Sequence, residues 1–167
     1  MRVNFRAKFG NMTFFVMLSR YQKLEGITNE YDKKKRLFYP FWDIEGCSLE
    51  ECKKSLDNIM LSYDLGDIFI TTDNDKTYRA WSWYPIKWKT YLKVLLDTEF
   101  LDYNFFFWTV KRGYATLRTS LKEGRQEQRV VAMIKSDLDL KPVFLKETTS
   151  ITYDTGIEKQ GRFINIG

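Results

Sequence analysis

The chain has 167 residues, of which 44% are hydrophobic and 17% aromatic, and its formal net charge at pH 7 is +5. This length and composition predict one folded domain with a hydrophobic core, and the positive charge fits an anionic partner. The sequence contains no histidine. That absence excludes serine–histidine and cysteine–histidine catalysis, histidine-ligated zinc and the histidine-pair endonucleases that initiate rolling-circle replication.

The cysteines and the hydropathy pattern indicate a cytoplasmic protein. Cys47 and Cys52 are the only cysteines, and they are too few for a thiolate zinc site and lack CxxC spacing. No apolar run is long enough to span a bilayer, and residues 1–10 lack the apolar core of a signal peptide. We therefore expect reduced thiols, a cytoplasmic location and no membrane partner.

The N-terminal part is expected to hold a hairpin and a polar connection. Residues 2–9 and 12–19 alternate as strands do, and Gly10-Asn11 between them suits a two-residue turn. Residues 22–36 are polar and end in four consecutive basic residues. Such a run is typical of a solvated loop and also suits contact with phosphates.

The segment that follows is predicted to be a buried strand that ends in two acids, Asp43 and Glu45. Successive side chains on a strand point to opposite faces, so these two carboxylates share a face. Two like charges side by side are unfavourable unless a cation lies between them. The pair therefore indicates either a divalent metal site or two solvated acids that enter a turn at Gly46.

The pattern after Gly46 predicts two helices and three strands, each with its own signal: a capping box, polar turn residues, a proline that can start a helix, and a β-branched, aromatic run. The expected elements are a helix from the capping box of Ser48 and Glu51 to about Tyr63, strands at 67–72 and 77–83, a helix after Pro85 and a strand at 103–110.

This order predicts an α+β fold with a ferredoxin-like, RRM-like βαββαβ core and both helices on one face of the sheet. We expect a single domain, 1–167, that consists of the core at 37–110, an N-terminal hairpin at 2–19 and C-terminal strands at 112–166 that extend the sheet. In such a core the first strand lies between the third and the fourth. That arrangement would bring the end of the first strand close to the starts of its two neighbours.

Three acids and an arginine would then meet at one edge of the open sheet face. Asp43, Glu45 and Asp102 could hold one or two Mg²⁺ or Mn²⁺ ions, which prefer oxygen ligands. Arg79 would neutralise a substrate phosphate, as phosphoryl chemistry requires. The alternatives are a salt bridge from Arg79 to Asp43 or Asp102, and a strand-entry turn at Asp102.

The C-terminal third carries a dense group of basic residues. Residues 111–120 and 129–136 are predicted as strands, and further short strands are expected after residue 140. Arg112, Arg118 and Lys122 would bind the phosphates of a nucleotide or a nucleic-acid backbone. The alternative is an exposed hairpin whose charges are balanced.

Three motifs resemble those of the archaeo-eukaryotic primase superfamily, the primase-polymerases. WDIEG at 42–46 resembles the family's acid-x-acid motif, IFITTDNDKTYRAW at 68–81 its second motif, and FLD at 100–102 its hydrophobic-Asp motif. The resemblance covers residues 37–135. Arg79 stands where the family usually has a nucleotide-contacting histidine, and an arginine can bind a triphosphate but cannot titrate near neutrality.

The resemblance implies metal-dependent nucleotidyl transfer on a DNA or RNA template from nucleoside triphosphates, with Asp43, Glu45 and Asp102 as catalytic metal ligands. It also implies a role in replication of a plasmid or virus, alongside a helicase or another replication protein. TLRTSLK at 116–122 resembles the region that contacts template or nucleotide in some members. Two alternatives stay open: a non-catalytic DNA- or RNA-binding replication accessory protein of the same fold, and a metal-dependent nuclease that uses the same carboxylates.

Overall fold

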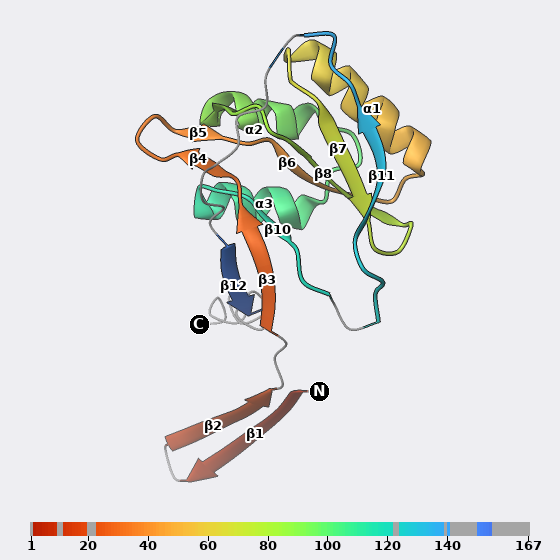
Figure 1. Ribbon diagram of the computed structural model, residues 1–167. Coiled ribbons are helices and arrows are strands. Elements are labelled where there is room, and N and C mark those ends of the chain that lie inside the picture. The colour runs from red at the N-terminus through yellow and green to blue at the C-terminus, as the bar shows by residue number, and fades with distance from the viewer. Residues whose placement is uncertain are drawn as a thin grey trace.

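A computed structural model of the chain is shown in Figure 1. It describes residues 2–9, 12–19, 23–121, 124–138, 140 and 150–154, with side chains described for 26–121, 124–138 and 140. Within these residues the chain forms three helices and four antiparallel sheets, so the predicted α+β class is confirmed. None of the described helices is both long and apolar enough to cross a bilayer.

The main sheet has four strands in the order β11-β7-β8-β6. Its strands are β6 (Phe41–Glu45), β7 (Ile68–Thr72), β8 (Thr77–Ser82) and β11 (Arg129–Ile134). The register places Asp43 of β6 and Thr71 of β7 on either side of Arg79 of β8. These three side chains therefore share one face of the sheet.

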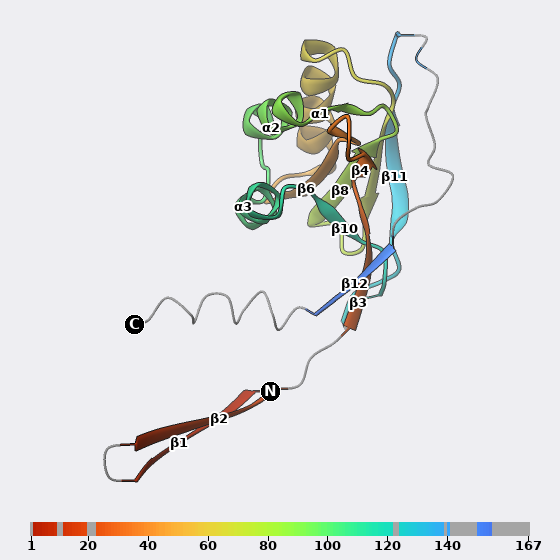
Figure 2. The ribbon, with the colours of Figure 1, turned by 90° about the vertical axis from the view of Figure 1, so that its left-hand side faces the viewer.

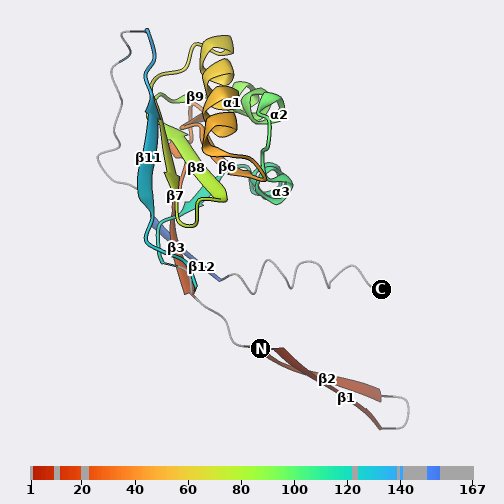
Figure 3. The same ribbon diagram turned by 90° about the vertical axis from the view of Figure 1, so that its right-hand side faces the viewer.

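Two helices, α1 (Leu49–Ser62) and α2 (Trp88–Asp97), cover the opposite face of this sheet (Figure 3). The capping box predicted at Ser48 is present at the start of α1. Both helices bury one apolar stripe, and Trp42 and Ile44 of β6 are fully buried in the same core. Because alternate residues of β6 are held in this way, Asp43 and Glu45 are directed to the other face.

The third helix, α3 (Tyr103–Arg112), replaces the strand predicted at 103–110, and that prediction was wrong. The Asp102 carboxylate caps the helix by accepting a hydrogen bond from the Asn104 N–H at 2.8 Å. Gly113 ends it in the left-handed conformation with φ 80°. These two end signals outweigh the β-propensity of the aromatic residues between them.

Loss of that strand changes the predicted core. The part β6-α1-β7-β8-α2 has the expected order, but β6 lies at the edge of the sheet instead of between two strands. On its other side β6 makes one bridge within the described residues, between Ile44 and Leu101. The specific ferredoxin-like arrangement is therefore not confirmed.

The N-terminal region is richer in strands than predicted. The hairpin of β1 (Arg2–Phe9) and β2 (Met12–Ser19) forms as expected, whereas its turn lies outside the described residues. The polar segment at 22–36 contains β3 (Lys23–Thr28) and β4 (Glu30–Asp32), which were not predicted, whereas its basic run at 33–36 forms an exposed turn, as expected of a solvated loop. The partners of both strands lie far along the chain or across a turn, which a local hydrophobic pattern does not reveal.

The smaller sheets join these N-terminal strands to later parts of the chain. In one sheet, β3 lies between β10 (Thr116–Arg118) and β12 (Ser150–Asp154), below the main sheet in Figures 1 and 2. In another, β4 pairs with β5 (Leu37–Phe38), which pairs with β9 (Ile86–Lys87).

The C-terminal strands were predicted in part. The strand expected at 111–120 is limited to β10, because its first two residues belong to α3. The strand expected at 129–136 is confirmed as β11. Of the strands expected after residue 140, β12 is described, and the rest of that region lies outside the described residues.

Candidate functional site

Two acids stand at the end of β6, on the face that α1 and α2 leave uncovered. Asp43 is partly buried, and Glu45 is exposed. Opposite them on β8 the register places Arg79 and Thr77. Within the described part of the chain, neither the Asp43 nor the Glu45 carboxylate takes part in a hydrogen bond or a salt bridge. Neither carboxylate is therefore neutralised by an ion pair among the described residues.

A third acid, Asp102, is brought to the same place by the segment before α3. The Asp102 N–H donates to the Asp43 carbonyl oxygen at 2.8 Å, and the Glu45 N–H donates to the Phe100 carbonyl oxygen at 3.0 Å. These two bonds flank the bridge between Ile44 and Leu101. Asp102 thus lies beside Asp43 as the sequence predicted, although a bridge and a helix cap hold it there and not a fourth strand.

Burial is the main factor that opposes the ionisation of Asp43. The pKa of Asp43 is raised to about 6, because burial, together with the nearby charges of Asp102 and Glu45, outweighs the opposite effect of Arg79 and Arg118. An aspartate with a pKa near 6 stays partly protonated in mildly acidic solution. A cation bound beside Asp43 would therefore favour its ionised form.

The donor set suits a hard cation, although not as a complete cage. Within the described residues, no three acids or cysteines are placed so that they could hold a metal ion by themselves. Mg²⁺ is commonly bound by one or two carboxylates together with water and substrate phosphates. Asp43 with Glu45 or Asp102 fits that mode, so metal ligation by the three acids stays a prediction.

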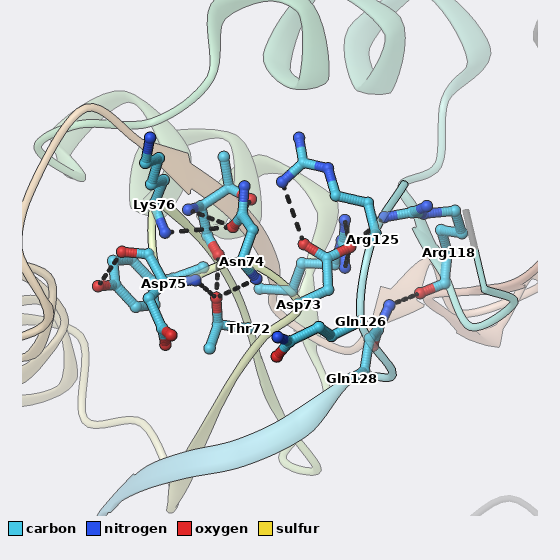
Figure 4. Close-up of polar contacts among 12 residues, drawn as sticks. Thr72, Asp73, Asn74, Asp75, Lys76, Arg118, Arg125, Gln126 and Gln128 are labelled. Atoms are coloured by element: carbon cyan, nitrogen blue, oxygen red, sulfur yellow. Dashed lines mark hydrogen bonds and ion pairs between the residues drawn. The ribbon is translucent and has the colours of Figure 1, made fainter. Parts of the chain in front are cut away.

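A second charged group lies next to the first and is built around Asp73, which directly follows β7. The Asp73 side chain is 1% exposed. Its Oδ2 atom lies 2.5 Å from Arg118 Nη2 and 3.4 Å from both Nη1 and Nη2 of Arg79, and its Oδ1 atom lies 3.5 Å from Arg125 Nη1. Figure 4 shows Arg118 and Arg125 approaching Asp73 from the later part of the chain. We call these four residues the arginine cluster.

The arginine cluster has more positive than negative charge. Burial raises the pKa of Asp73, but the guanidinium groups of Arg79, Arg118 and Arg125 outweigh burial and hold its pKa below the ordinary value. One carboxylate neutralises one of the three cations, so the cluster has a formal excess of positive charge beside the acids of β6. Such an excess favours a bound anion.

The turn between β7 and β8 holds Asp73 in place by side-chain hydrogen bonds. Thr72 Oγ1 accepts from the N–H groups of Asn74 and Asp75 at 3.3 and 2.9 Å, and Asn74 Oδ1 accepts from the Thr77 N–H at 3.0 Å. These bonds are drawn in Figure 4. They supply local partners to backbone groups at a tight turn, which fixes the position of Asp73.

The predicted phosphate-binding residues that the structure describes lie in two places. Arg79 and Arg118 belong to the arginine cluster, and the salt bridge of Arg79 is to Asp73 and not to Asp43 or Asp102. Arg112 lies at the end of α3, with its Cζ atom 5.1 Å from the centre of the Trp108 ring. Lys122 lies outside the described residues.

Sequence reasoning missed Asp73 and Arg125. Asp73 was read as a turn residue, yet it follows Thr71 by two positions and so continues the sheet face that carries Arg79. That spacing was a usable signal. Arg125 comes from a connection that no periodic pattern places, so nothing in the sequence indicated its contact with Asp73.

An open groove of about 930 Å³ adjoins Glu45, the one acid of the three that is among its lining residues. Glu45, Phe100, Leu101 and Tyr103 are among the residues that line it. The groove therefore leads from the end of β6 to the start of α3.

No protein-family model matches the chain, and comparisons with curated proteins and with solved structures found no match. A function must therefore be inferred from the geometry of the site.

Proposed function

We propose that this protein transfers nucleotidyl groups to a nucleic acid, at the edge of the sheet where β6 ends. The placement of Asp102 beside Asp43 carries the proposal, because it joins acids that are far apart in the sequence. The arginine cluster supports it, since Arg79 and Arg118 both act on the charge of Asp43. Acids and an excess of guanidinium groups side by side suit a reaction at a phosphate.

The acidic residues would bind metal, and the basic residues would bind phosphate. Asp43, Glu45 and Asp102 would hold Mg²⁺ or Mn²⁺, and such an ion stabilises the charge that develops on the attacking and leaving oxygens. Arg118, Arg79 and Arg125 would hold the triphosphate, because their three guanidinium groups converge on one place, beside Asp73. Arg79 would position the phosphate without moving a proton, because a guanidinium does not titrate near neutrality.

The order of the motifs favours a primase-polymerase-like activity within this reaction class. The acid-x-acid motif at 42–46, Arg79 and the Asp of FLD at 100–102 are adjacent in the fold. The substrates would be nucleoside triphosphates and a DNA or RNA template, in the replication of a plasmid or virus with a helicase or another replication protein.

A primer-extension assay tests the proposal. Purified protein is incubated with a labelled primer on a template, a nucleotide mixture and Mn²⁺ or Mg²⁺, and the products are separated by length. We expect extension that Asp43→Asn reduces more than about 100-fold, because the substitution removes a metal-binding charge while keeping the shape of the side chain.

The matched control is Asp57→Asn, which makes the same chemical change on the exposed side of α1. It should extend the primer as well as the wild type does. Equal extension by the Asp43→Asn protein, or no extension under any metal and nucleotide condition, would overturn the proposal.

A second candidate function is that of a non-catalytic DNA- or RNA-binding replication accessory protein. The ion pair between Arg79 and Asp73 favours it, because an arginine held by a carboxylate has less charge to offer a triphosphate. Tight template binding without extension would identify this function. Shortening of the labelled primer would instead identify a metal-dependent nuclease.

A further inference from the structure

Helix α3 presents aromatic side chains to solvent. Tyr103 is 73% exposed and Phe107 is 45% exposed. The two residues are four positions apart, and their rings stack with centroids 6.4 Å apart and planes inclined by 26°. Two large aromatic rings side by side on a surface indicate a place where a partner binds.

Cations lie next to these rings on the same helix. The Lys111 Nζ atom is 4.7 Å from the centre of the Trp108 ring and 5.8 Å from that of Phe107. Arg112 also lies over Trp108. Together, Tyr103, Phe107, Trp108, Lys111 and Arg112 form what we call the α3 ridge. Residues 103–112 include no acidic side chain, and the one carboxylate on the helix is that of its cap, Asp102.

The α3 ridge starts at the candidate site. Its first residue, Tyr103, lines the open groove together with Glu45, and Asp102 is the cap of the same helix. From Tyr103 to Lys111 the helix rises about 12 Å, at about 1.5 Å per residue. A chain leaving the groove can therefore continue along the ridge for about three stacked nucleotides.

We propose that the α3 ridge binds a single strand of nucleic acid, with bases stacked on Tyr103 and Phe107 and phosphates paired with Lys111 and Arg112. The inference rests on the proposed function, because it names the surface on which the template of that site lies. Unpaired bases stack on aromatic rings whatever their sequence, and cations beside the rings meet the backbone. An acidic peptide would satisfy the cations but would leave the stacked rings without flat partners.

Fluorescence anisotropy with a short labelled oligothymidine tests this binding, in EDTA so that no metal contributes. Tyr103→Ala and Phe107→Ala should each weaken binding about tenfold, because each removes one stacking surface. Lys111→Gln should weaken binding less and make it less sensitive to salt, because it removes a phosphate contact. A duplex of the same sequence should bind more weakly and should not respond to Tyr103→Ala, since its bases are already stacked.

Matched controls come from other helices. Leu96→Ala removes an apolar side chain that is 66% exposed on α2, and Lys54→Gln removes an exposed cation on α1. Both should bind the oligonucleotide as the wild type does. Wild-type affinity in the Tyr103→Ala and Phe107→Ala proteins would overturn the inference. The inference would also be overturned if polyglutamate displaced the labelled oligothymidine as well as unlabelled oligonucleotide does. Self-association through this face, without any effect of the ridge variants on oligonucleotide binding, would overturn it too.

The outcome is separable from that of the primer-extension assay. The Asp43→Asn protein should still bind the oligonucleotide in EDTA, because the ridge does not include the acids. Ridge-dependent binding by a protein that never extends a primer would overturn the proposed function alone. Primer extension together with ridge variants that bind normally would overturn this inference alone.

Discussion

Asp43 and Asp73 lie at the same edge of one sheet face, yet their carboxyl groups behave in opposite ways. The pKa of Asp43 is raised to about 6, whereas that of Asp73 is lowered, although the Asp73 side chain is only 1% exposed. Burial raises the pKa of both groups. At Asp73 three guanidinium groups in contact with the carboxylate outweigh burial, whereas no salt bridge reaches Asp43 within the described residues.

This contrast separates a structural carboxylate from a functional one. Asp73 is ionised because Arg79, Arg118 and Arg125 stabilise its negative charge. That charge in turn holds the three arginines together and so stabilises the fold. Asp43 is ionised at neutral pH against its surroundings, so its charge lowers the stability of the fold. A charge that lowers the stability of the fold is typical of a functional site.

The largest effect on stability should come from Asp73→Asn. This substitution keeps the size of the side chain and removes the negative charge that three arginines share, so two buried guanidiniums lose their counterion. Removing one partner of a buried ion pair destabilises a protein by about 3–5 kcal/mol. Urea unfolding at neutral pH, followed by circular dichroism, measures the change in the free energy of unfolding.

The adjacent Asp75 provides the control, because it pairs with Arg129 at 2.6 Å but is 63% exposed. Asp75→Asn should change the free energy of unfolding by less than about 1 kcal/mol, as is usual for surface ion pairs. Equal losses for both variants would show that the arginine cluster is no more important to the fold than an exposed pair.

An opposite and smaller effect is expected for Asp43→Asn, which should stabilise the protein at pH 7.5 in EDTA. The difference between 3.8 and about 6 in the pKa of Asp43 corresponds to about 3 kcal/mol, which is an upper limit for the gain. The amide removes a charge that is unfavourable in the fold. Urea unfolding of both proteins gives the gain, and Asp57→Asn on exposed α1 serves as the control with no expected change.

The stabilisation by Asp43→Asn should depend on pH. Between pH 3.8 and about 6 the unfolded Asp43 is ionised while the folded one keeps its proton, so its contribution to stability increases as the pH falls. The advantage of Asp43→Asn over the wild type should therefore shrink as the pH falls from 7.5 to below 5. Asp73 acts in the opposite sense, since its contribution is present above pH 3.8 and is lost below it. A constant difference between the two proteins from pH 5 to 7.5 would contradict the raised pKa of Asp43.

Much of the fold was predictable where one local signal decided the outcome. The capping box at Ser48 placed α1, and alternation placed β1 and β2. The strand predicted at 103–110 was wrong because the aromatic composition was given more weight than the residues at the two ends. Asp102 and Gly113 mark the start and the end of a helix. The strands β3 and β4 were not predicted, because their pairing partners do not follow them directly in the sequence and polar strands show no hydrophobic alternation.

The candidate site was predictable in its acids and in part in its arginines, because Arg79 and Arg118 were named from the sequence and Arg125 was not. Alternation on β6 put Asp43 and Glu45 on one face, and the expected neighbour of β6 put Asp102 beside them, although a bridge at Leu101 replaces the strand. The partner of Arg79 was mistaken, because a buried Asp73 within a turn looks like any polar turn residue. Only the folded chain shows that Arg118 and Arg125 converge on it.

The smallest change in the free energy of unfolding is expected for Arg125→Gln, which tests how much Arg125 contributes to the neutralisation of Asp73. Arg125 is 31% exposed and lies 3.5 Å from Asp73, whereas Arg118 is 8% exposed and lies 2.5 Å away. Arg125→Gln should therefore cost less than about 1 kcal/mol in urea unfolding, because Arg79 and Arg118 still neutralise Asp73. Arg129→Gln, in an exposed pair with Asp75, is the matched control and should cost a similar amount. A loss above about 2 kcal/mol for Arg125→Gln alone would mean that all three guanidiniums are needed to keep Asp73 ionised. Arg125 could not then be released to a triphosphate without weakening the fold.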